Sequence, residues 1–271
     1  MPRVSVVITT YNRSRVLPSA IESAKKAATN SEVIVVDDCS TDDTPDVCAQ
    51  IPDIRYIRLN TNSGLAHARN TGIAESSSEF IAFLDDDDLR LPNSLDKQLH
   101  AIGVDENIAV CYGQALIGDA RRQLPTGEIY PLKCPQGDIF WELLEDNFIP
   151  MPSVLARKAT LLDAGGFNTD LKLIEDWDMW LRLSEYFPVA AIAEPVAIYR
   201  KASAASEQMC SNSAALVKEA LKVQQSALNR PRARAATGKQ RRHVQREFRN
   251  RVYEILMAAA TNSIHEGNNR S

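Results

Sequence analysis

Three short apolar segments in the first hundred residues each end in polar or acidic side chains, and this pattern constrains the fold more than any other feature of the chain. The three have the length of buried strands and cover residues 4–9, 32–36 and 80–84. A fourth segment, 54–59, alternates apolar and polar residues and predicts a half-exposed strand. Helices are predicted at 15–28, at 65–75 and from Pro92 to about residue 102. Apolar strands that alternate with helices predict an α/β fold with a mostly parallel sheet covered on both faces.

The polar residues that follow these strands are expected to meet at one edge of the sheet. Ligands of open parallel sheets bind beyond the carboxyl ends of the strands. The residues at these ends are Thr9, Thr10 and Tyr11 after the first strand, Asp37 and Asp38 after the second, and Asp85 to Asp88 after the third. Residues that lie far apart in the sequence should therefore line one site.

The composition excludes several classes of protein. The chain has 271 residues, 44% of them hydrophobic, and a net charge of −4, so it is too apolar and too weakly charged to be intrinsically disordered. Its five cysteines form no C-x-x-C pair, which argues against a disulfide framework or a structural zinc site. No segment approaches the roughly 20 apolar residues of a transmembrane helix, and no signal-peptide pattern follows the N-terminus. These features predict a soluble cytoplasmic protein.

The last seventy residues differ from the rest in charge and in pattern. From residue 201 onward there are 13 Lys and Arg against 5 Asp and Glu, whereas the preceding residues carry 18 against 30. The last part is also poor in strand-like segments and rich in Ala, Gln and Arg, which favours helix. We therefore divide the chain into a compact α/β unit over 1–204 and a basic helical extension over 205–271.

The extension offers an apolar face beside its charges, formed by Val244, Phe248, Val252 and Ile255. The favoured interpretation is a helix that docks on the α/β unit or on a second copy in a homo-oligomer. The alternative is peripheral association with an anionic membrane surface. Nucleic-acid binding is not expected, because no aromatic residues are interleaved with the basic ones for base stacking.

Four consecutive aspartates, Asp85 to Asp88, follow a buried strand and repel one another unless a cation lies among them. Asp85 and Asp87 have the D-x-D spacing that lets a turn direct two carboxylates at one ion. Mg²⁺ or Mn²⁺ is typically bound by one or two carboxylates together with substrate phosphates. The alternative is a solvated acidic turn that precedes the next helix.

Three further side chains have both a structural and a functional interpretation. Asp38 could accept N–H groups of a nucleobase or simply open the loop 39–42. Tyr11 offers a ring on which a base could stack. Arg69, on the predicted helix after Gly64, could reach a diphosphate or lie at the surface.

A second informative region is a predicted amphipathic helix over 176–187. Trp177 and Trp180 share one face of it and are expected in the core. Glu175 and Asp176 lie at its start, where the positive end of a helix favours carboxylates. They are either ordinary first-turn residues, or one of them is a general base over a bound substrate.

Five blocks of sequence, taken in order, resemble the family 2 glycosyltransferases. They are VSVVITTYNR, VIVVDDCSTD, NTNSGLAHARNTGI, FIAFLDDDD and GGF…EDWDMWLRL, and with their connections they span residues 3–200. Each block is weak alone, but their order is that of the family. The resemblance implies the GT-A fold, a nucleotide-sugar donor, a divalent cation (Mn²⁺ or Mg²⁺) and inversion at the anomeric carbon. It also implies a nucleotide-sugar-binding half up to about residue 105 and an acceptor half over 106–204.

The resemblance assigns donor-binding roles position by position. Thr9, Tyr11 and Asp38 match positions that contact the nucleobase. Arg69 matches a donor-binding position, and Asp86 matches a contact to the ribose or the sugar.

The resemblance also assigns the metal and catalytic roles. Asp85 and Asp87 match the metal-binding D-x-D, with Asp87 as the direct ligand. Asp176 matches the catalytic base, and Glu175 lies beside it on the acceptor side. One position departs from the pattern: many relatives carry a histidine near the metal after a late Tyr-Arg, and here Ala202 occupies that place. Either the cation has fewer protein ligands in this chain, or the motif is shifted along the sequence.

Together these features predict an inverting glycosyltransferase that moves a sugar from a nucleoside-diphosphate sugar, a UDP-sugar first, to a hydroxyl of a glycan, a lipid-linked or a small-molecule acceptor. A loop over 117–137, which contains Pro and Gly, is expected to cover that acceptor. A sugar nucleotidyltransferase is disfavoured, because Tyr11-Asn12-Arg13 stands where such enzymes need a Gly-rich loop. A non-catalytic protein that binds nucleotide sugars on the same fold remains the alternative, and the intact acidic sites favour an enzyme.

Overall fold

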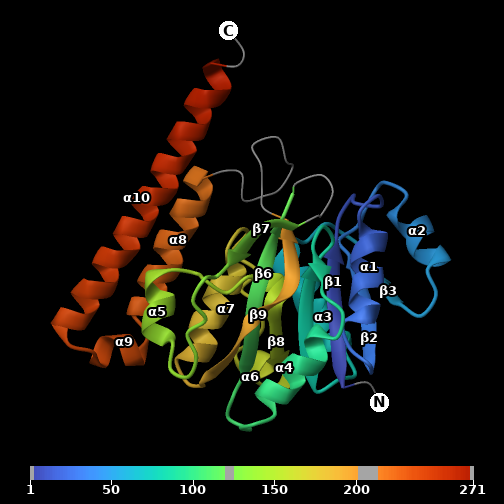
Figure 1. Cartoon of the computed structure of the whole chain (residues 1–271), viewed down its shortest axis with the longest axis horizontal. Helices are drawn as coiled ribbons and strands as arrows, with labels where there is room; N and C mark the ends of the chain where they lie inside the picture. The colour runs from blue at the N-terminus through green and yellow to red at the C-terminus, as the bar shows by residue number, and fades with distance from the viewer. Residues whose placement is uncertain (1–2, 120–124, 201–212, 269–271) are drawn as a thin grey trace.

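The computed structural model describes residues 3–119, 125–200 and 213–268, and Figure 1 shows a central sheet with helices on both of its faces. In these ranges the sheet has nine strands, in the order β3-β2-β1-β4-β8-β6-β9-β5, with β7 paired to β6. The strands are β1 (Val4–Thr10), β2 (Ser31–Asp37), β3 (Arg55–Arg58), β4 (Phe80–Asp85), β5 (Leu89–Arg90), β6 (Val110–Gly118), β7 (Pro125–Tyr130), β8 (Val154–Arg157) and β9 (Val189–Arg200).

Helices separate and follow these strands along the chain. They are α1 (Leu17–Lys26), α2 (Thr44–Gln50), α3 (Leu65–Glu75), α4 (Ser94–Ile102), α5 (Phe140–Glu145), α6 (Lys158–Asp163), α7 (Glu175–Ser184), α8 (Ser213–Leu228), α9 (Pro231–Ala235) and α10 (Gly238–Asn268). A short 3₁₀ helix, η1 (Met151–Ser153), leads into β8.

The predicted α/β fold is confirmed, and the direction of the strands changes along the sheet. β1 pairs in parallel with β2 and β4, and β2 pairs in parallel with β3. β8 runs antiparallel to β4 and β6, whereas β6 and β9 are again parallel. The first four strands are parallel because a helix connects each of them to the next and returns the chain to the same end of the sheet. The sheet is mixed beyond β4.

Alternate residues of the central strands pack into two separate cores. Val6 and Ile8 of β1 belong to a core shared with α1 and α4. Val7, between them, belongs to the core shared with α3, α5 and α7. Successive side chains of a strand point to opposite faces, so a near-continuous apolar strand requires a helical layer on each side.

Most of the predicted elements occur close to their predicted positions. The helix predicted at 65–75 has the bounds of α3, and the four early strands match β1 to β4 to within one residue at either end. The short helix α2 was not predicted, and Pro92 precedes α4 rather than lying in its first turn. α7 ends at Ser184 rather than at residue 187.

The prediction of a loop throughout 117–137 was wrong, because this segment contains the strand β7. β7 is antiparallel to β6, with Ala115 opposite Tyr130 and Leu116 opposite Ile129. The backbone hydrogen bonds of β7 come from its pairing with β6. The Pro and Gly residues of this segment indicate a loop, because the local sequence contains no information about that partner strand.

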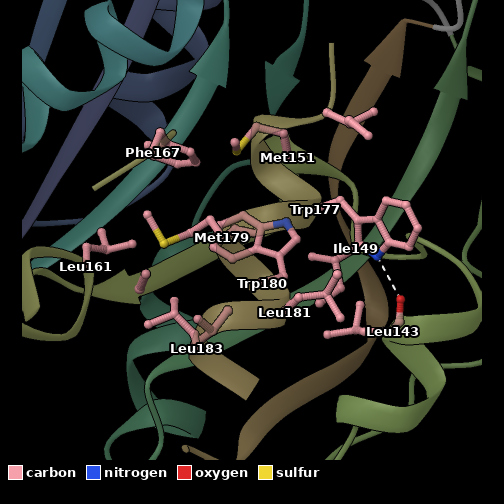
Figure 2. Packing of buried hydrophobic residues seen from close by; sticks show 14 of the residues in the cluster. Leu143, Ile149, Met151, Leu161, Phe167, Trp177, Met179, Trp180, Leu181 and Leu183 are labelled. Carbon is pink, nitrogen blue, oxygen red and sulfur yellow. Dashed lines mark hydrogen bonds between the residues drawn. The ribbon is translucent and has the colours of Figure 1, made fainter. Parts of the chain in front are cut away.

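The tryptophans of α7 lie in the core, as predicted. Trp177 and Trp180 are 3% and 1% exposed, and Figure 2 shows them with neighbouring residues of α7 among the side chains of Phe167 and Met151. The Trp177 indole Nε1 donates to the Leu143 carbonyl at 2.7 Å, so its polar edge is satisfied inside the core.

The C-terminal helices dock on the α/β unit through the expected apolar face. α8 and α10 lie beside α5 and α7 (Figure 1). Val244 and Phe248 are buried, and the Phe248 ring stacks on Trp177 with 5.7 Å between ring centroids. The predicted boundary at residue 204 lies in 201–212, outside the described residues. Across the described ranges, no helix is both long and apolar enough to cross a membrane.

Candidate functional site

A cavity of about 720 Å³ lies where β1, β2 and β4 end. All nine residues predicted for the site line it: Thr9, Tyr11, Asp38, Arg69, Asp85, Asp86, Asp87, Glu175 and Asp176. Three of the contributing elements are parallel neighbours, so their carboxyl ends lie at one edge. The helices α3 and α7 add Arg69 and the two acidic residues at the start of α7. The structure therefore brings the predicted residues together, and the role of each stays a prediction.

The two aspartates after β2 have different partners. Asp37 is fully buried and its Oδ1 accepts the backbone N–H of Ser40 at 2.8 Å. Asp38 faces the cavity, and its two oxygens accept the backbone N–H groups of Ser63 at 2.7 Å and Gly64 at 2.8 Å. Asp37, rather than Asp38, thus anchors the loop after β2, while Asp38 fixes the turn that leads into α3.

Thr9 and Tyr11, at the end of β1, contribute a hydroxyl group and an aromatic ring to the cavity. The Thr9 hydroxyl is buried and makes no hydrogen bond to the described residues. Tyr11 is 43% exposed and lines the cavity, so its ring is accessible to a planar ligand.

Arg69 is buried between two carboxylates. Its guanidinium donates to Asp85 Oδ1 at 2.8 Å and to Glu175 Oε1, and it lies 5.6 Å from the centroid of the Phe167 ring. Only 2% of the residue is exposed, so the alternative of a surface arginine is wrong. Charge-assisted hydrogen bonds of this kind fix the relative positions of the end of β4 and the start of α7.

Asn70, next to Arg69 on α3, holds the turn that precedes α7. Its Oδ1 accepts the Phe167 backbone N–H at 2.7 Å, and its Nδ2 donates to the Phe167 carbonyl at 2.9 Å. Gly166 has φ +74°, and a Cβ added there would lie 2.6 Å from Asn70 Oδ1. This close approach requires glycine and explains the irregular backbone before the acidic helix start.

The acidic run at the end of β4 is largely buried. Asp86, Asp87 and Asp88 are 8%, 7% and 1% exposed. Arg200 forms an ion pair with Asp87, and its backbone N–H donates to Asp88 Oδ1 at 2.7 Å. Burial, together with the charge of Asp87, raises the pKa of Asp86 to about 7. Burial also raises the pKa of Asp88 well above its ordinary value.

Asp85 and Asp87 are the side chains suited to a divalent cation. Both line the cavity. Within 3–119, 125–200 and 213–268 there is no cluster of three or more His, Cys, Asp or Glu that could hold an ion. Two carboxylates completed by substrate oxygens are a usual donor set for Mg²⁺ or Mn²⁺. Burial first, and then the charges of the neighbouring aspartates, raise the pKa values of Asp86 and Asp88, and a cation would offset those charges. Ala202 lies outside the described residues.

Asp176 and Glu175 begin α7 in different environments. Glu175 Oε1 accepts from Arg69, and its Oε2 is buried without a hydrogen bond to any described residue. Burial, with the charge of Glu175, raises the pKa of Asp176 to about 7, although Arg69 opposes the shift. Asp176 Oδ1 accepts from the Trp177 N–H at 2.7 Å and from Asn147 Nδ2 at 3.4 Å. Among the described residues both bonds involve Oδ1, so Oδ2 is the oxygen available to take a proton.

Further residues contribute to the site that were not predicted for it, among them Arg13, Tyr130, Asn147 and Arg200. Arg13 ends the first quoted block and Arg200 belongs to the late Tyr-Arg, so the family pattern was the signal that could have found them. Tyr130 and Asn147 come from β7 and from the loop after α5, where the sequence shows no motif. Only the tertiary structure brings them to Asp176.

Solved structures place the chain in a fold class. The crystal structure of Staphylococcus aureus TarS 1–349 with UDP-GlcNAc matches with a TM-score of 0.72 at 22% identity, over 93% of this chain and 73% of that one. The structure of the same protein with UDP matches with a TM-score of 0.68, also at 22% identity, over 93% and 72%. The chain therefore has the GT-A fold.

Sequence comparison gives the family. The model described as "Glycosyl transferase family 2" matches residues 5–161, which is more than half of the chain, so the chain belongs to this family. An uncharacterized glycosyltransferase of Haemophilus influenzae is 32% identical over 184 residues, which are 66% of this chain and 61% of that protein. The Escherichia coli UDP-Glc:alpha-D-GlcNAc-diphosphoundecaprenol beta-1,3-glucosyltransferase WfgD is 32% identical over 193 residues, 70% of this chain and 72% of that protein. The chain thus spans about three fifths of the length of the first of these relatives.

Removal of the Arg69 side chain should destabilise the protein. Arg69→Met leaves the buried Glu175 carboxylate without its cation, and breaking a buried pair in this way costs about 3–5 kcal/mol of unfolding free energy. Arg55→Met is the control, because the side chains of Arg55 and its partner Glu75 are 50% and 43% exposed, so their ion pair should contribute within about 1 kcal/mol. Urea unfolding monitored by circular dichroism measures both, and equal costs for the two variants would contradict the buried bridge.

Proposed function

We propose that this chain is an inverting glycosyltransferase that moves a sugar from a nucleoside-diphosphate sugar to an acceptor hydroxyl. One observation carries the proposal: Asp85 to Asp87 and Asp176 line a single cavity, and burial raises the pKa of Asp176 to about 7. A general base is most effective when its pKa lies near the working pH. The names of the relatives support a UDP-sugar as donor, since WfgD is named for UDP-Glc and TarS was solved with UDP-GlcNAc.

In the proposed reaction the acceptor oxygen attacks the anomeric carbon from the face opposite the leaving group. A new C–O bond forms as the bond from the anomeric carbon to the diphosphate oxygen breaks. This single displacement inverts the configuration at the anomeric carbon. Asp176 takes the hydroxyl proton, and the nucleoside diphosphate leaves with the bonding electron pair. Proton removal by a positioned base accelerates such a step by about 10²–10⁴-fold.

The donor lies along the ends of β1, β2 and β4 in this proposal. The exposed Tyr11 ring stacks on the nucleobase, and Thr9 and Asp38 contact its edge. Asp86 contacts the ribose or the sugar, and Arg69 contributes positive charge toward the diphosphate.

Asp87 and Asp85 would hold Mn²⁺ or Mg²⁺, whose charge offsets the negative charge that develops on the leaving diphosphate. The chain's own contribution there is to hold these carboxylates at the cavity wall through Arg200 and Arg69. The family histidine is replaced by Ala202, so we propose that substrate oxygens complete the coordination.

The acceptor is a carbohydrate in this proposal, with a lipid-linked sugar as one class. The support is the name of WfgD, which specifies a GlcNAc-diphosphoundecaprenol acceptor. The alternative is a non-catalytic protein that binds nucleotide sugars. The raised pKa of Asp176 favours the enzyme, because a purely binding site has no need of a buried base beside the donor cavity.

Asp176→Asn should strongly reduce the rate of transfer and leave donor binding nearly unchanged. A panel of UDP-, GDP- and dTDP-sugars with Mn²⁺ first identifies the donor by thermal shift, and product analysis then measures transfer. We expect kcat to fall by about 10²-fold or more, because the amide cannot take the proton, and UDP affinity to stay within about twofold by calorimetry. Asp170→Asn, an exposed aspartate on the loop before α7, is the matched control. Near wild-type transfer by Asp176→Asn would contradict its role as base.

The pH profile of the wild type checks the same assignment. A base must be ionised to take a proton, so kcat/KM should be low at pH 5, rise through a midpoint near the Asp176 pKa of about 7, and reach a plateau above it. A rate that is constant between pH 5 and pH 8 would contradict the assignment.

Asp87→Ala should remove the metal dependence of donor binding. Titration calorimetry with UDP in Mn²⁺ and in a chelator should show tighter binding with Mn²⁺ for the wild type and no such gain for Asp87→Ala. Asp46→Ala, an exposed aspartate on α2, is the control and should keep the gain. Equal wild-type affinity in Mn²⁺ and chelator would remove the cation from the proposal.

We also propose that α10 associates with an anionic membrane surface. Its exposed cations Lys239, Arg242, Arg246 and Arg249 recur every three or four residues and so lie on one face, away from the buried Val244 and Phe248. The chain should co-sediment with vesicles containing phosphatidylglycerol at low salt and be released at high salt. Phosphatidylcholine vesicles are the control, and no binding to the anionic vesicles at low salt would contradict this proposal.

A further inference from the structure

Asp176 is contacted by a wall of the cavity that lies outside the sequence motifs. Asn147 Nδ2 donates to Asp176 Oδ1 at 3.4 Å, and the Tyr130 hydroxyl donates to the Asn147 carbonyl at 2.9 Å. Both Tyr130 and Asn147 line the cavity, as do Ile149 further along the same loop and Met151 at the start of η1. The loop 146–151 and the end of β7 therefore form the surface next to the proposed base.

This loop begins where α5 ends, and the end of α5 is held by other helices. Trp177 Nε1 on α7 donates to the Leu143 carbonyl at 2.7 Å (Figure 2), and Gln224 Nε2 on α8 donates to the Leu144 carbonyl at 3.3 Å. The last carbonyls of a helix have no partner within it, so these two side chains supply bonds that fix the last turn. The position of the loop is therefore set from α7 and α8.

The long helix α10 adds a charged contact at the point where the loop starts. Arg251 Nε lies 3.1 Å from Asp146 Oδ1, and the same guanidinium interacts with the Tyr130 side chain. Arg251 Nη1 also donates to Glu254 Oε2 at 3.0 Å, one turn along α10, which holds the guanidinium in place. One side chain of the C-terminal extension thus reaches both Asp146 and Tyr130, the two residues that flank Asn147 in this wall.

We propose that Arg251 is a positioning residue for the acceptor side of the site. It fixes Asp146 and Tyr130, and through them it holds Asn147 against Asp176 and shapes the surface on which the acceptor lies. The inference rests on the proposed function, in which Asp176 is the base, and it assigns a task to a helix beyond the residues 5–161 that the family model matches.

Because this ion pair is partly exposed, its effect on positioning can be measured separately from its effect on the stability of the fold. The Arg251 and Asp146 side chains are 42% and 35% exposed, and ion pairs in such places contribute little to folding. Catalysis is more sensitive, because a displacement of about 1 Å in a positioning group can cost about 10²-fold in rate. Loss of Arg251 should therefore affect acceptor turnover more than it affects the unfolding midpoint.

The test compares Arg251→Met with Lys222→Met. The methionine keeps much of the apolar stem of the basic side chain and removes its charge. Lys222 is exposed on α8, and it contacts neither the loop nor β7 through any hydrogen bond or ion pair among the described residues. We expect Arg251→Met to lower kcat and raise the acceptor KM, with a combined loss in kcat/KM of about 10–100-fold. UDP affinity and the unfolding midpoint should stay at wild-type values, Lys222→Met should behave as wild type, and Arg251→Lys should recover part of the loss.

A second measurement does not depend on any transfer activity. Amide hydrogen exchange of the substrate-free chain should be faster over residues 146–151 in Arg251→Met than in the wild type, with no change at the ends of β1 and β4. Unchanged exchange over 146–151 would overturn the inference, whatever the chain catalyses. So would an equal loss of UDP affinity and transfer, which would show a general structural defect. Absence of transfer in the wild type together with faster exchange in Arg251→Met would instead count against the proposed function alone.

Discussion

The side chain of Arg69 joins two carboxylates that lie far apart in the sequence, and the geometry of the site depends on this bridge. Asp85 ends β4, and Glu175 begins α7, 106 residues from Arg69. A guanidinium buried to this degree requires anionic partners, and each carboxylate in turn requires a cation. The bridge therefore sets the separation between the donor-side acidic run and Asp176, the residue that follows Glu175.

Around that bridge the protein keeps more negative charge than its own cations offset. Burial raises the pKa of Asp86 and Asp176 to about 7 and that of Asp88 well above the ordinary range. An arrangement of this kind costs folding free energy, and such clusters occur where binding or catalysis uses the charge. In the proposed reaction a divalent cation and the acceptor proton each offset part of this negative charge, so the electrostatic cost is greatest in the substrate-free state.

The second half of the chain completes the site from outside the motifs. β7 and the loop after α5 bring Tyr130 and Asn147 to Asp176. Hydrogen bonds from α7 and α8 and an ion pair from α10 hold the end of α5. The basic extension consequently packs as part of the same core as the α/β unit, through Val244 and Phe248. Its exposed cations lie on another face, so docking and an interaction with an anionic surface are compatible uses of one helix.

The sequence by itself determined the parallel half of the sheet and the nine side chains that meet at its edge. Strand-helix alternation has few topological solutions, and a polar residue after a buried strand of a parallel sheet must lie at the carboxyl edge, so Thr9, Asp38 and Asp87 could be placed without coordinates. Only the tertiary structure decided the strand directions beyond β4, the burial of Arg69 and the contact between Asn147 and Asp176. Each of these depends on a contact between distant segments, and neither local periodicity nor residue spacing carries information about the partner.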